Sequence, residues 1–542
     1  MSFTSIPFLW FLAAFLTLYG LCPATYRRYL LLLGSFVFIA MESLAAAAIA
    51  LLFAGLNYGL GICIQRTERR TLVLGMAISI DVLFMATFKL ANIVTSGFSF
   101  YLFAFIAYLV EIYRSTIQAE TDPIRFASYS FFFPKFTMGP ITRYSEMADQ
   151  LDKPRINAAS FQKGLEDFTL GFVLKILVCD RLGILFSSQY DSTLCKYVKI
   201  PYDDLLQTGY EYISTDLAWF GALVASLHIY LEWISYMYMA IGLAYLLGFK
   251  LPQNFNYPYT ARTVGDYYRR WHMTLTRWFK DFIYIPLGGS RRGLSKTIVN
   301  VLFVWLLTSL WHGNGLAGKY VLWGIAAGAA MLLDPICYNK ITNRSDREPD
   351  LSLRILGHLP LLLLVLVSIL VLRKPASGYN FILWGMSIGV LIVLERLWKT
   401  FVVERFHFGA RFGKTDLLGK TWKLLVSLLA HIWVVVTMVL SWVVFSIKDY
   451  DKLKLYFSRL FPAAGASAGV IENDLSLRWD KLGIYVLIAV LFCFPVVDRG
   501  IRLLKRTKYG TWIVSAILAG LFWYAIYILN TTGSNPMGYA QF

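Results

Sequence analysis

Charged residues are scarce in this chain of 542 residues. Asp, Glu, Lys and Arg make up 15% of it, against roughly 25% in ordinary globular domains. Acidic residues are the scarcer kind, because 33 Asp and Glu stand against 51 Lys and Arg, a formal charge of +18. Hydrophobic residues make up 57% of the chain. This composition excludes an ordinary soluble enzyme and predicts a single polytopic, all-α membrane domain with no large soluble part.

Several familiar signatures are also absent. The six cysteines include no C-x-x-C pair, and neither H-E-x-x-H nor G-x-x-x-x-G-K-[ST] occurs. A disulfide framework, a metal site and a nucleotide-binding P-loop are therefore not expected. The excess of Lys and Arg falls in short loops between apolar runs, where the positive-inside bias places it. We interpret this charge as membrane topology, with lipid as the partner, and expect no nucleic-acid binding.

Apolar runs mark the candidate membrane helices. Some runs are too short to cross a bilayer upright, so we expect about 11 to 14 transmembrane or re-entrant helices. The predicted runs are Phe8–Leu21, Tyr29–Met41, Leu44–Ile64, Thr71–Phe88, Phe98–Val110, Phe168–Leu185, Leu217–Leu247, Ile298–Leu310, Tyr320–Leu333, Ile355–Leu372, Phe381–Leu394, Leu424–Phe445, Leu482–Val497 and Thr511–Leu529.

Charge orients these helices, because cytoplasmic loops retain Lys and Arg. Residues 248–296 hold nine basic and two acidic residues, whereas residues 187–216 hold two basic and five acidic ones. The first segment should face the cytoplasm and the second the outside. Alternation then places residues 111–163, 340–354, 395–423 and 498–508 inside and both termini outside.

Two cytoplasmic segments do not look like simple loops. Residues 128–141 are apolar but interrupted by Pro134, Gly139 and Pro140, and residues 271–287 are amphipathic at helical spacing. Irregular backbone at membrane depth is tolerated only where protein or a water-filled cavity satisfies it. We therefore expect both segments to line a cleft that opens to the cytoplasm.

Two histidines are candidates for proton transfer. His312 ends a short apolar run just before Gly313, and imidazole is the side chain best suited to accept a hydroxyl proton near neutral pH. A structural histidine that bonds a carbonyl is the equally weighted alternative. His272 lies in the amphipathic cytoplasmic segment, where an interfacial role is the more frequent explanation for a single histidine.

Two further features carry charge. His228 and Glu232 are four residues apart, so they share one helix face, and Glu232 should turn inward to His228 or a basic partner. They either fix helix packing or orient the site. A basic, glycine-containing strip could hold the phosphates of a donor or anchor lipid headgroups. Its members are Arg269, Arg270, Arg277, Lys280, Arg291 and Arg292.

The sequence resembles the membrane-bound O-acyltransferase family, most closely its bacterial alginate O-acetyltransferase branch. The resemblance runs in order from the first span to about residue 335, with a looser hydropathy match beyond. One run departs from the pattern: relatives commonly carry Asp-Phe-Ser-Gly-Tyr-Ser-Asp where this chain has Glu232 to Tyr238, so Tyr238 replaces the second acid. Four stretches carry the resemblance: Ser99-Phe100-Tyr101 with Tyr108, Tyr113 and Arg114; Phe133-Pro134 with Gly139-Pro140-Ile141 and Arg143; Met239–Gly242 with Asn254–Tyr259; and Arg270-Trp271-His272 through Leu287-Gly288-Gly289 to Trp311-His312-Gly313.

The resemblance implies a helical bundle of about eleven helices around a tunnel, with His312 as the catalytic residue and His272 as a second tunnel residue. Trp271, Trp311, Tyr238 and Asn254 would line or support that tunnel, together with Glu232 and His228. It divides the single domain into N-terminal helices (1–125), a motif-bearing core (126–335) and C-terminal helices (336–542).

The resemblance also implies a reaction. An acetyl group would pass from acetyl-CoA or an acyl-carrier thioester, with no tightly bound cofactor, to a hydroxyl of an extracytoplasmic polysaccharide or to a relay protein of the SGNH type. The location would be the inner membrane of a bacterial cell. Two alternatives stay open: D-alanyl transfer from a carrier protein to teichoic acid, and a transporter or scaffold.

Overall fold

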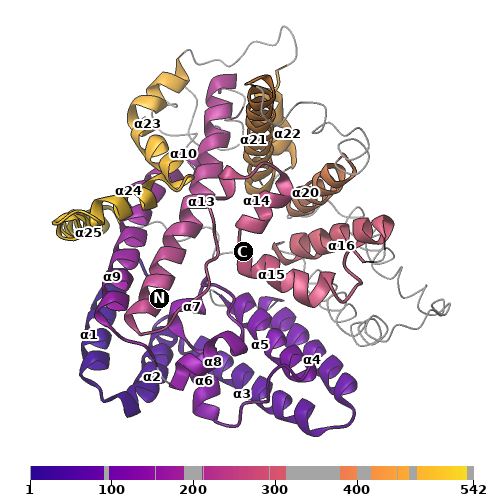
Figure 1. Ribbon diagram of the computed structural model, residues 1–542, viewed down its shortest axis with the longest axis vertical. Helices are drawn as coiled ribbons and strands as arrows, with labels where there is room; N and C mark the ends of the chain where they lie inside the picture. Colours follow the sequence, from indigo (N-terminus) through magenta and orange to yellow (C-terminus); the bar gives the residue numbers. More distant parts are fainter. Residues whose placement is uncertain are drawn as a thin grey trace.

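The computed structural model describes residues 2–90, 97–152, 154–187, 210, 213–291, 293–312, 379–398, 417–447, 450–462 and 473–533. These residues form helices and no β-strand, which confirms the all-α class (Figure 1). The predicted runs Tyr320–Leu333 and Ile355–Leu372 lie outside the described residues.

The N-terminal helices follow the hydropathy pattern closely and gather in one part of the molecule (Figure 1). Ser5 begins α1 and Ser43 begins α3, because each side chain accepts a hydrogen bond from a backbone N–H of the first turn, as helix-capping serines do. The helices are α1 (Ile6–Leu21), α2 (Arg27–Ala40), α3 (Leu44–Arg66), α4 (Arg70–Leu90) and α5 (Phe98–Tyr113).

The predicted cytoplasmic segment 111–163 is largely helical rather than a loop. Asp122 caps its first helix, and the chain breaks after Ser130 and again after Phe136, where the sequence predicts an interrupted segment. The helices are α6 (Pro123–Ser130), α7 (Phe133–Phe136), α8 (Tyr144–Asp152) and α9 (Ala158–Val173). The span predicted from Phe168 therefore begins ten residues earlier, at Ala158, and continues through a π-helical turn, η2 (Leu174–Cys179), into α10 (Asp180–Ser187).

The central element is α13 (Thr215–Leu246), a 32-residue helix. In its most apolar stretch 83% of the residues are buried, and it packs against α9, α21 and α23 (Figure 1). Small residues allow the close approach to α9. A Cβ at Gly171 would lie 2.4 Å from the Ser235 carbonyl oxygen, and one at Gly242 would lie 2.4 Å from the Phe168 nitrogen.

The remaining helices surround α13. They are α14 (Val264–Arg270), α15 (Met273–Phe279) with the π-helical turn η5 (Lys280–Tyr284), α16 (Leu294–His312), α20 (Tyr379–Trp398), α21 (Leu417–Ser446), α22 (Tyr450–Leu460), α23 (Asp474–Phe492), α24 (Val496–Lys505) and α25 (Gly510–Thr532). The helix predicted over residues 271–287 begins only at Met273. His272 has a left-handed backbone (φ 45°), so it cannot form part of the right-handed helix. Most of the segment 498–508, predicted as a cytoplasmic loop, belongs to α24.

Four described helices are long and apolar enough to cross a membrane: residues Leu44–Arg66, Thr215–Leu246, Ser427–Ser446 and Gly510–Thr532. A fifth crossing would be the pair Arg478–Phe492 and Val496–Lys505, which bends by 75°. Four shorter apolar helices, Ile6–Leu21, Phe100–Tyr113, Lys296–Ser309 and Ile382–Glu395, lie among them. The chain is thus a multi-pass membrane protein in which several apolar helices are too short to cross upright.

Candidate active site

His272 lies in the interior of the bundle, at the turn between α14 and α15. Only 4% of it is exposed. Three aromatic rings surround the imidazole: the ring centroids of Trp233, Phe255 and Phe100 lie 4.8, 6.3 and 6.2 Å from its own. These rings come from α13, from the segment before α14 and from α5, so three separate parts of the chain enclose one imidazole. The interfacial position that the sequence favours for a single histidine is therefore wrong.

The imidazole of His272 has no polar partner in the described part of the chain, and its burial favours the neutral form. Neither ring nitrogen has a hydrogen-bond partner among the described residues. Burial lowers its pKa from the ordinary 6.5 to about 3, since an apolar surrounding disfavours the charged form. Buried polar atoms without partners are rare in proteins and call for an explanation. A ring that can still donate from one nitrogen and accept at the other is suited to bind a polar group of a substrate.

Asn254 fixes the turn that carries His272. Its side-chain oxygen accepts hydrogen bonds from the Thr274 backbone nitrogen (3.0 Å) and the Thr274 hydroxyl (2.9 Å), and its backbone oxygen accepts one from the Met273 nitrogen (2.8 Å). The Ile141 nitrogen donates to the same Thr274 hydroxyl at 3.0 Å. Both of the segments predicted to be irregular thus meet at Thr274, which the sequence alone does not single out.

Trp271 points into an aromatic cluster beside His272. Its ring stacks on Tyr267 (centroids 5.6 Å apart) and lies 4.8 Å from Trp442 and 5.0 Å from Phe255. The indole is 4% exposed. The cluster ties the turn to α21, so Trp271 supports the position of His272 by packing.

His312 and Trp311 are the last described residues of α16. The helix extends four residues further at its start and two further at its end than the predicted run Ile298–Leu310. Their side chains and Gly313 lie outside the described residues. The helix is anchored beside the His272 turn, because Trp305 packs edge-on against Tyr268 of α14 (4.5 Å), and α16 also contacts η5.

Glu232 finds the basic partner that its burial requires. Lys175 of η2 places its Nζ 3.9 Å from a Glu232 oxygen and 2.5 Å from Asp180 Oδ1. Of the two partners that the sequence allows for Glu232, the basic residue is the one found. His228 packs against α10 instead, where a Cβ at Gly183 would lie 2.7 Å from its Nε2. The sequence could have indicated Lys175 and Asp180, because both are ionisable within the predicted span Phe168–Leu185.

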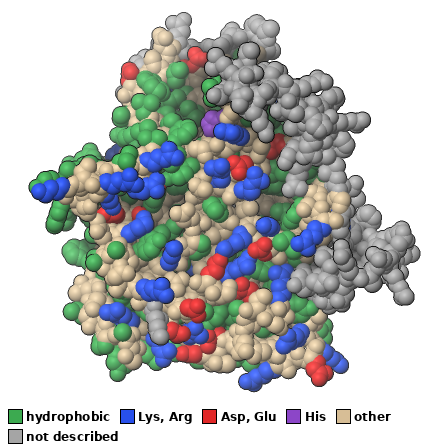
Figure 2. All heavy atoms as spheres, viewed as in Figure 1, with side chains coloured by type: hydrophobic (Ala, Val, Ile, Leu, Met, Phe, Trp, Pro, Cys, Tyr) green, Lys and Arg blue, Asp and Glu red, His purple; other side chains and the backbone are tan. Residues whose placement is uncertain are grey.

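The predicted donor strip is divided by ion pairs. Arg277 makes two contacts with Glu146, at 2.6 and 3.0 Å, and Arg270 and Arg269 both pair with Asp266, at 2.9 and 3.2 Å. Lys280 and Arg291 are exposed, and Arg292 lies outside the described residues. Figure 2 shows Lys and Arg side chains interleaved with Asp and Glu over α14 and α24 on this face. The strip offers fewer uncommitted cations than its sequence suggests.

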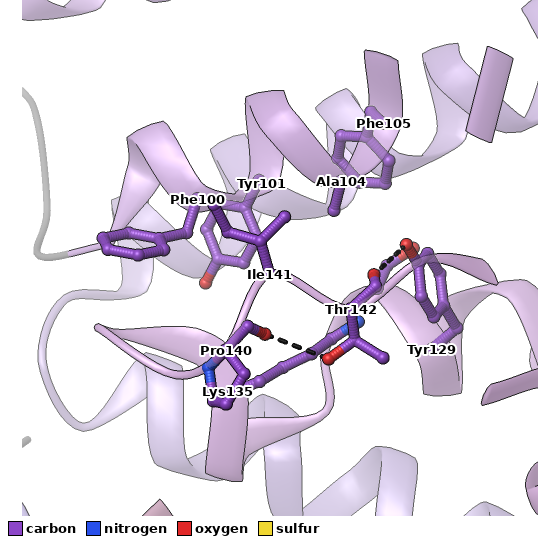
Figure 3. Close-up of a pocket in the computed structure, with 10 residues that line it drawn as sticks. Phe100, Tyr101, Ala104, Phe105, Tyr129, Lys135, Pro140, Ile141 and Thr142 are labelled. Carbon is purple, nitrogen blue, oxygen red and sulfur yellow. Dashed lines mark hydrogen bonds between the residues drawn. The ribbon is translucent and has the colours of Figure 1, made fainter. Parts of the chain in front are cut away.

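A second buried base lies on the other side of Phe100. Lys135 of α7 is 7% exposed and its Nζ lies 3.6 Å from the centre of the Tyr129 ring, with no hydrogen bond inside the described part of the chain. Burial lowers its pKa to about 7. Figure 3 shows it beneath Thr142 in a pocket of about 20 Å³, where the Tyr129 hydroxyl donates to the Thr142 carbonyl (2.9 Å).

A much larger cavity of about 510 Å³ lies between α9, α13, residues 253–257, α24 and α25. Tyr238 and Asn254, two of the predicted tunnel residues, line it. The two irregular segments that the sequence predicts as cleft lining do not. Residues of the first segment line the smaller pocket instead, and Trp278 of the second is buried and donates to the Phe103 carbonyl at 2.8 Å. Asn254 joins this cavity to the turn that carries His272.

A buried imidazole whose ring nitrogens have no partner among the described residues can donate and accept hydrogen bonds to a substrate. Comparison with known proteins gives the class. The model of the membrane-bound O-acyltransferase family matches residues 82–348. The chain belongs to the membrane-bound O-acyltransferase family and is an O-acyltransferase.

Three relatives illustrate the similarity. A probable alginate O-acetylase AlgI of Pseudomonas putida is 27% identical over 92% of this chain and 97% of its own length. One of Azotobacter vinelandii is 31% identical over 62% of this chain and 68% of its own length. A peptidoglycan O-acetyltransferase of Helicobacter pylori is 29% identical over 60% of this chain and 64% of its own length.

Proposed function

We propose that this protein transfers an acetyl group from a cytoplasmic thioester to a hydroxyl group of a polysaccharide on the outer side of the bacterial inner membrane. The observation that carries the proposal is His272, a buried imidazole with no polar partner among the described residues, beside the helix that ends at His312. The names of the relatives support the acetyl group and a glycan acceptor, because they describe acetylation of alginate and of peptidoglycan.

In the proposed reaction His312 accepts the proton of the acceptor hydroxyl as its oxygen attacks the thioester carbonyl. The carbon–sulfur bond breaks, and the proton passes to the departing thiolate, so an ester and a free thiol form. His272 stays neutral and donates one N–H to the carbonyl oxygen, where negative charge develops. A transient acyl-histidine at His312 is the two-step variant of this reaction.

The donor enters from the cytoplasmic side, since its phosphates cannot cross the bilayer. The 510 Å³ cavity offers a route, because Asn254 lines it and also holds the His272 turn. The acetyl end would pass Asn254 towards the two histidines, and the phosphates would stay at the cytoplasmic surface. A relay protein of the SGNH type outside the membrane would carry the acetyl group onward where the polymer cannot reach the tunnel.

The test follows labelled acetyl groups in membranes of the native cell, from which the chromosomal copy has been deleted and replaced by variants. Acetyl-CoA labelled in the acetyl group should label the polysaccharide with the wild-type chain and with His431→Ala, a matched control histidine. His312→Ala should abolish labelling, and His272→Ala should lower it by about a hundredfold or more. Immunoblots must show equal amounts of protein in the membrane.

Three results would contradict parts of the proposal. Labelling that survives His312→Ala would show that His312 is not the catalytic base. Transfer only from a D-alanyl carrier protein, with none from acetyl-CoA, moves the chain to the teichoic-acid reaction. Transport of a solute that is unaffected by His312→Ala, without any transfer, identifies a transporter.

A further inference from the structure

The 510 Å³ cavity has a charged end formed by two helices from distant parts of the sequence. Lys163 lies on α9, and Arg502 and Lys505 lie on α24. The chain turns by 75° between α23 and α24, which brings α24 alongside α9 (Figure 1). Three cations therefore line one cavity. None of them belongs to the basic strip predicted from the sequence.

Only some of the N–H donors of these three cations have acceptors within the described residues. Lys163 pairs with Asp167 at 2.8 Å, and Lys505 pairs with Glu166. The Arg502 Nε donates to the Asp498 carbonyl oxygen at 3.2 Å, and the guanidinium forms no ion pair within the described residues. Four of its five N–H groups thus stay available for an acceptor, and a planar guanidinium matches phosphate oxygens well.

The one acid on α24 is already bound within the protein. The Asp498 carboxylate accepts hydrogen bonds from the Tyr238 hydroxyl (3.3 Å) and from the Tyr257 hydroxyl. Each of its two oxygens thus has a phenol donor, one from α13 and one from the segment before α14. Because Asp498 is engaged in this way, it competes little with an incoming anion for Arg502.

Amide and phenol side chains from residues 253–257 and Tyr238 continue the lining, and an apolar wall completes it. Leu170, Ile234 and Ile241 face Ile501, Val514 and Leu518 across the cavity. Most of α25 is exposed apolar surface, with 22% of its most apolar stretch buried, so the bilayer lies directly behind this wall. A volume of 510 Å³ falls within the range of small-molecule sites, about 300 to 1,000 Å³.

We propose that this cavity binds a phosphate-bearing amphiphile, with the phosphate on Lys163, Arg502 and Lys505 and the uncharged part along the apolar wall. Two compounds share this chemistry: the acyl-thioester nucleotide donor, in which case the inference rests on the proposed function, and an anionic phospholipid of the cytoplasmic leaflet. Helices α24 and α25 lie beyond the residues that the family model matches, whereas α9 and α13 lie within them.

The experiment measures binding to the full-length protein in nanodiscs of phosphatidylcholine. One arm titrates acetyl-CoA by calorimetry, and the other adds phosphatidylglycerol and counts bound lipid by native mass spectrometry. Arg502→Gln removes a charge without leaving an acid unpaired. Arg506→Gln, one turn further on and exposed, is the matched control, and Arg502→Glu reverses the charge at the same position.

Loss of a charge-assisted hydrogen bond of about 1.5 to 3 kcal/mol weakens binding by about tenfold or more. Arg502→Gln should weaken the binding of one of the two probes by this factor, and Arg502→Glu should weaken it further. Arg506→Gln should change the affinity by less than about twofold. Loss of acetyl-CoA binding identifies the donor, and loss of phosphatidylglycerol identifies the lipid. Equal binding of both probes to Arg502→Gln and to wild type would overturn the site.

Binding does not require turnover, so the titrations are repeated in the His312→Ala background. If transfer survives His312→Ala, the proposed reaction fails while the cavity result stands. If His312→Ala abolishes transfer but both probes bind Arg502→Gln as they bind wild type, the cavity proposal fails and the proposed reaction stands. A thermal melt of each variant shows that the fold is intact, and Lys163→Gln replaces any variant that does not fold.

Discussion

Asn254 and Thr274 are bound to each other by two hydrogen bonds, from the Thr274 nitrogen and from its hydroxyl to one amide oxygen. The pair joins the lining of the large cavity to the first turn of α15, two residues after His272. Because His272 has a left-handed backbone, which costs a residue other than glycine about 1 to 3 kcal/mol, the turn depends on such contacts. The position of the His272 imidazole thus depends on Asn254, which lies outside α15.

Asn254→Leu should lower the rate of acetyl transfer more than it lowers stability. The substitution leaves two buried donors of Thr274 without their acceptor, at a cost of about 1 to 3 kcal/mol each, and the turn can relieve this only by moving His272. We expect a fall in transfer of tenfold or more, measured as labelled acetyl in the polysaccharide. Gln118→Leu is the control, because Gln118 is exposed and does not line the large cavity. Equal activities of the two variants would refute the role of Asn254.

His272 should make the folded protein less stable in acid. Its pKa is about 3 when folded and near 6.5 when exposed. Between these values only the unfolded chain binds the proton, so stability falls as the pH is lowered from about 6.5, by at most about 1.4 kcal/mol per unit. Above 6.5 the group has no effect.

Melting temperatures of wild type and His272→Phe, measured from pH 7.5 to pH 4.5, test this linkage. The wild-type curve should fall more steeply below about pH 6.5, because phenylalanine fills the aromatic enclosure and cannot bind a proton. Parallel curves would show that His272 is accessible to protons in the folded state.

The α9–α13 contact should tolerate no side chain at Gly242. A Cβ there would meet the Phe168 backbone nitrogen at 2.4 Å, and backbone atoms cannot yield as a flexible side chain can. Overpacking of this kind costs about 1 to 3 kcal/mol, so Gly242→Ala should lower the melting temperature of the protein in detergent. Gly520→Ala on α25, where nothing lies within 4 Å, should leave it unchanged or raise it. A Gly242→Ala protein as stable as Gly520→Ala would contradict the close crossing.

Hydropathy predicts most of the described helices, because long apolar runs leave few other structures in a bilayer. Through a family resemblance, the sequence also predicts His272 and His312 as site residues, and their roles stay a prediction. It does not predict the start of α15, since a left-handed residue leaves no mark on apolar periodicity. It predicts a loop in place of α24, because charged residues obscure the amphipathic pattern of this ten-residue helix. Four of them lie in the helix and a fifth follows it: Asp498, Arg499, Arg502, Lys505 and Arg506.

Pairs that join distant segments are a second kind of information that the sequence lacks. Tyr238 and Asp498 are 260 residues apart, and nothing local to either residue indicates the other. The same holds for Lys505 and Glu166, which define the charged end of the cavity. The predicted donor strip contains a pair of the same kind, since Arg277 pairs with Glu146, 131 residues earlier in the chain.

Lys135 should be replaceable by an apolar side chain of similar length without loss of stability. Its amine lies over the Tyr129 ring and makes no hydrogen bond within the described residues, so the cost of burying a base is offset only by the ring. Lys135→Met removes that cost and keeps the packing volume, so the melting temperature should stay equal or rise. Lys135→Ala leaves a cavity and should destabilise the protein by about 2 kcal/mol or more.

The two variants separate packing from charge at this position. A drop in melting temperature for Lys135→Met as large as that for Lys135→Ala would mean that the ammonium group itself stabilises the fold. Acetyl transfer measured on the same membranes adds a second readout. Since Phe100 lies between the Lys135 pocket and His272, Lys135→Met should leave transfer close to wild type, whereas Lys135→Ala should lower it as the pocket collapses towards Phe100.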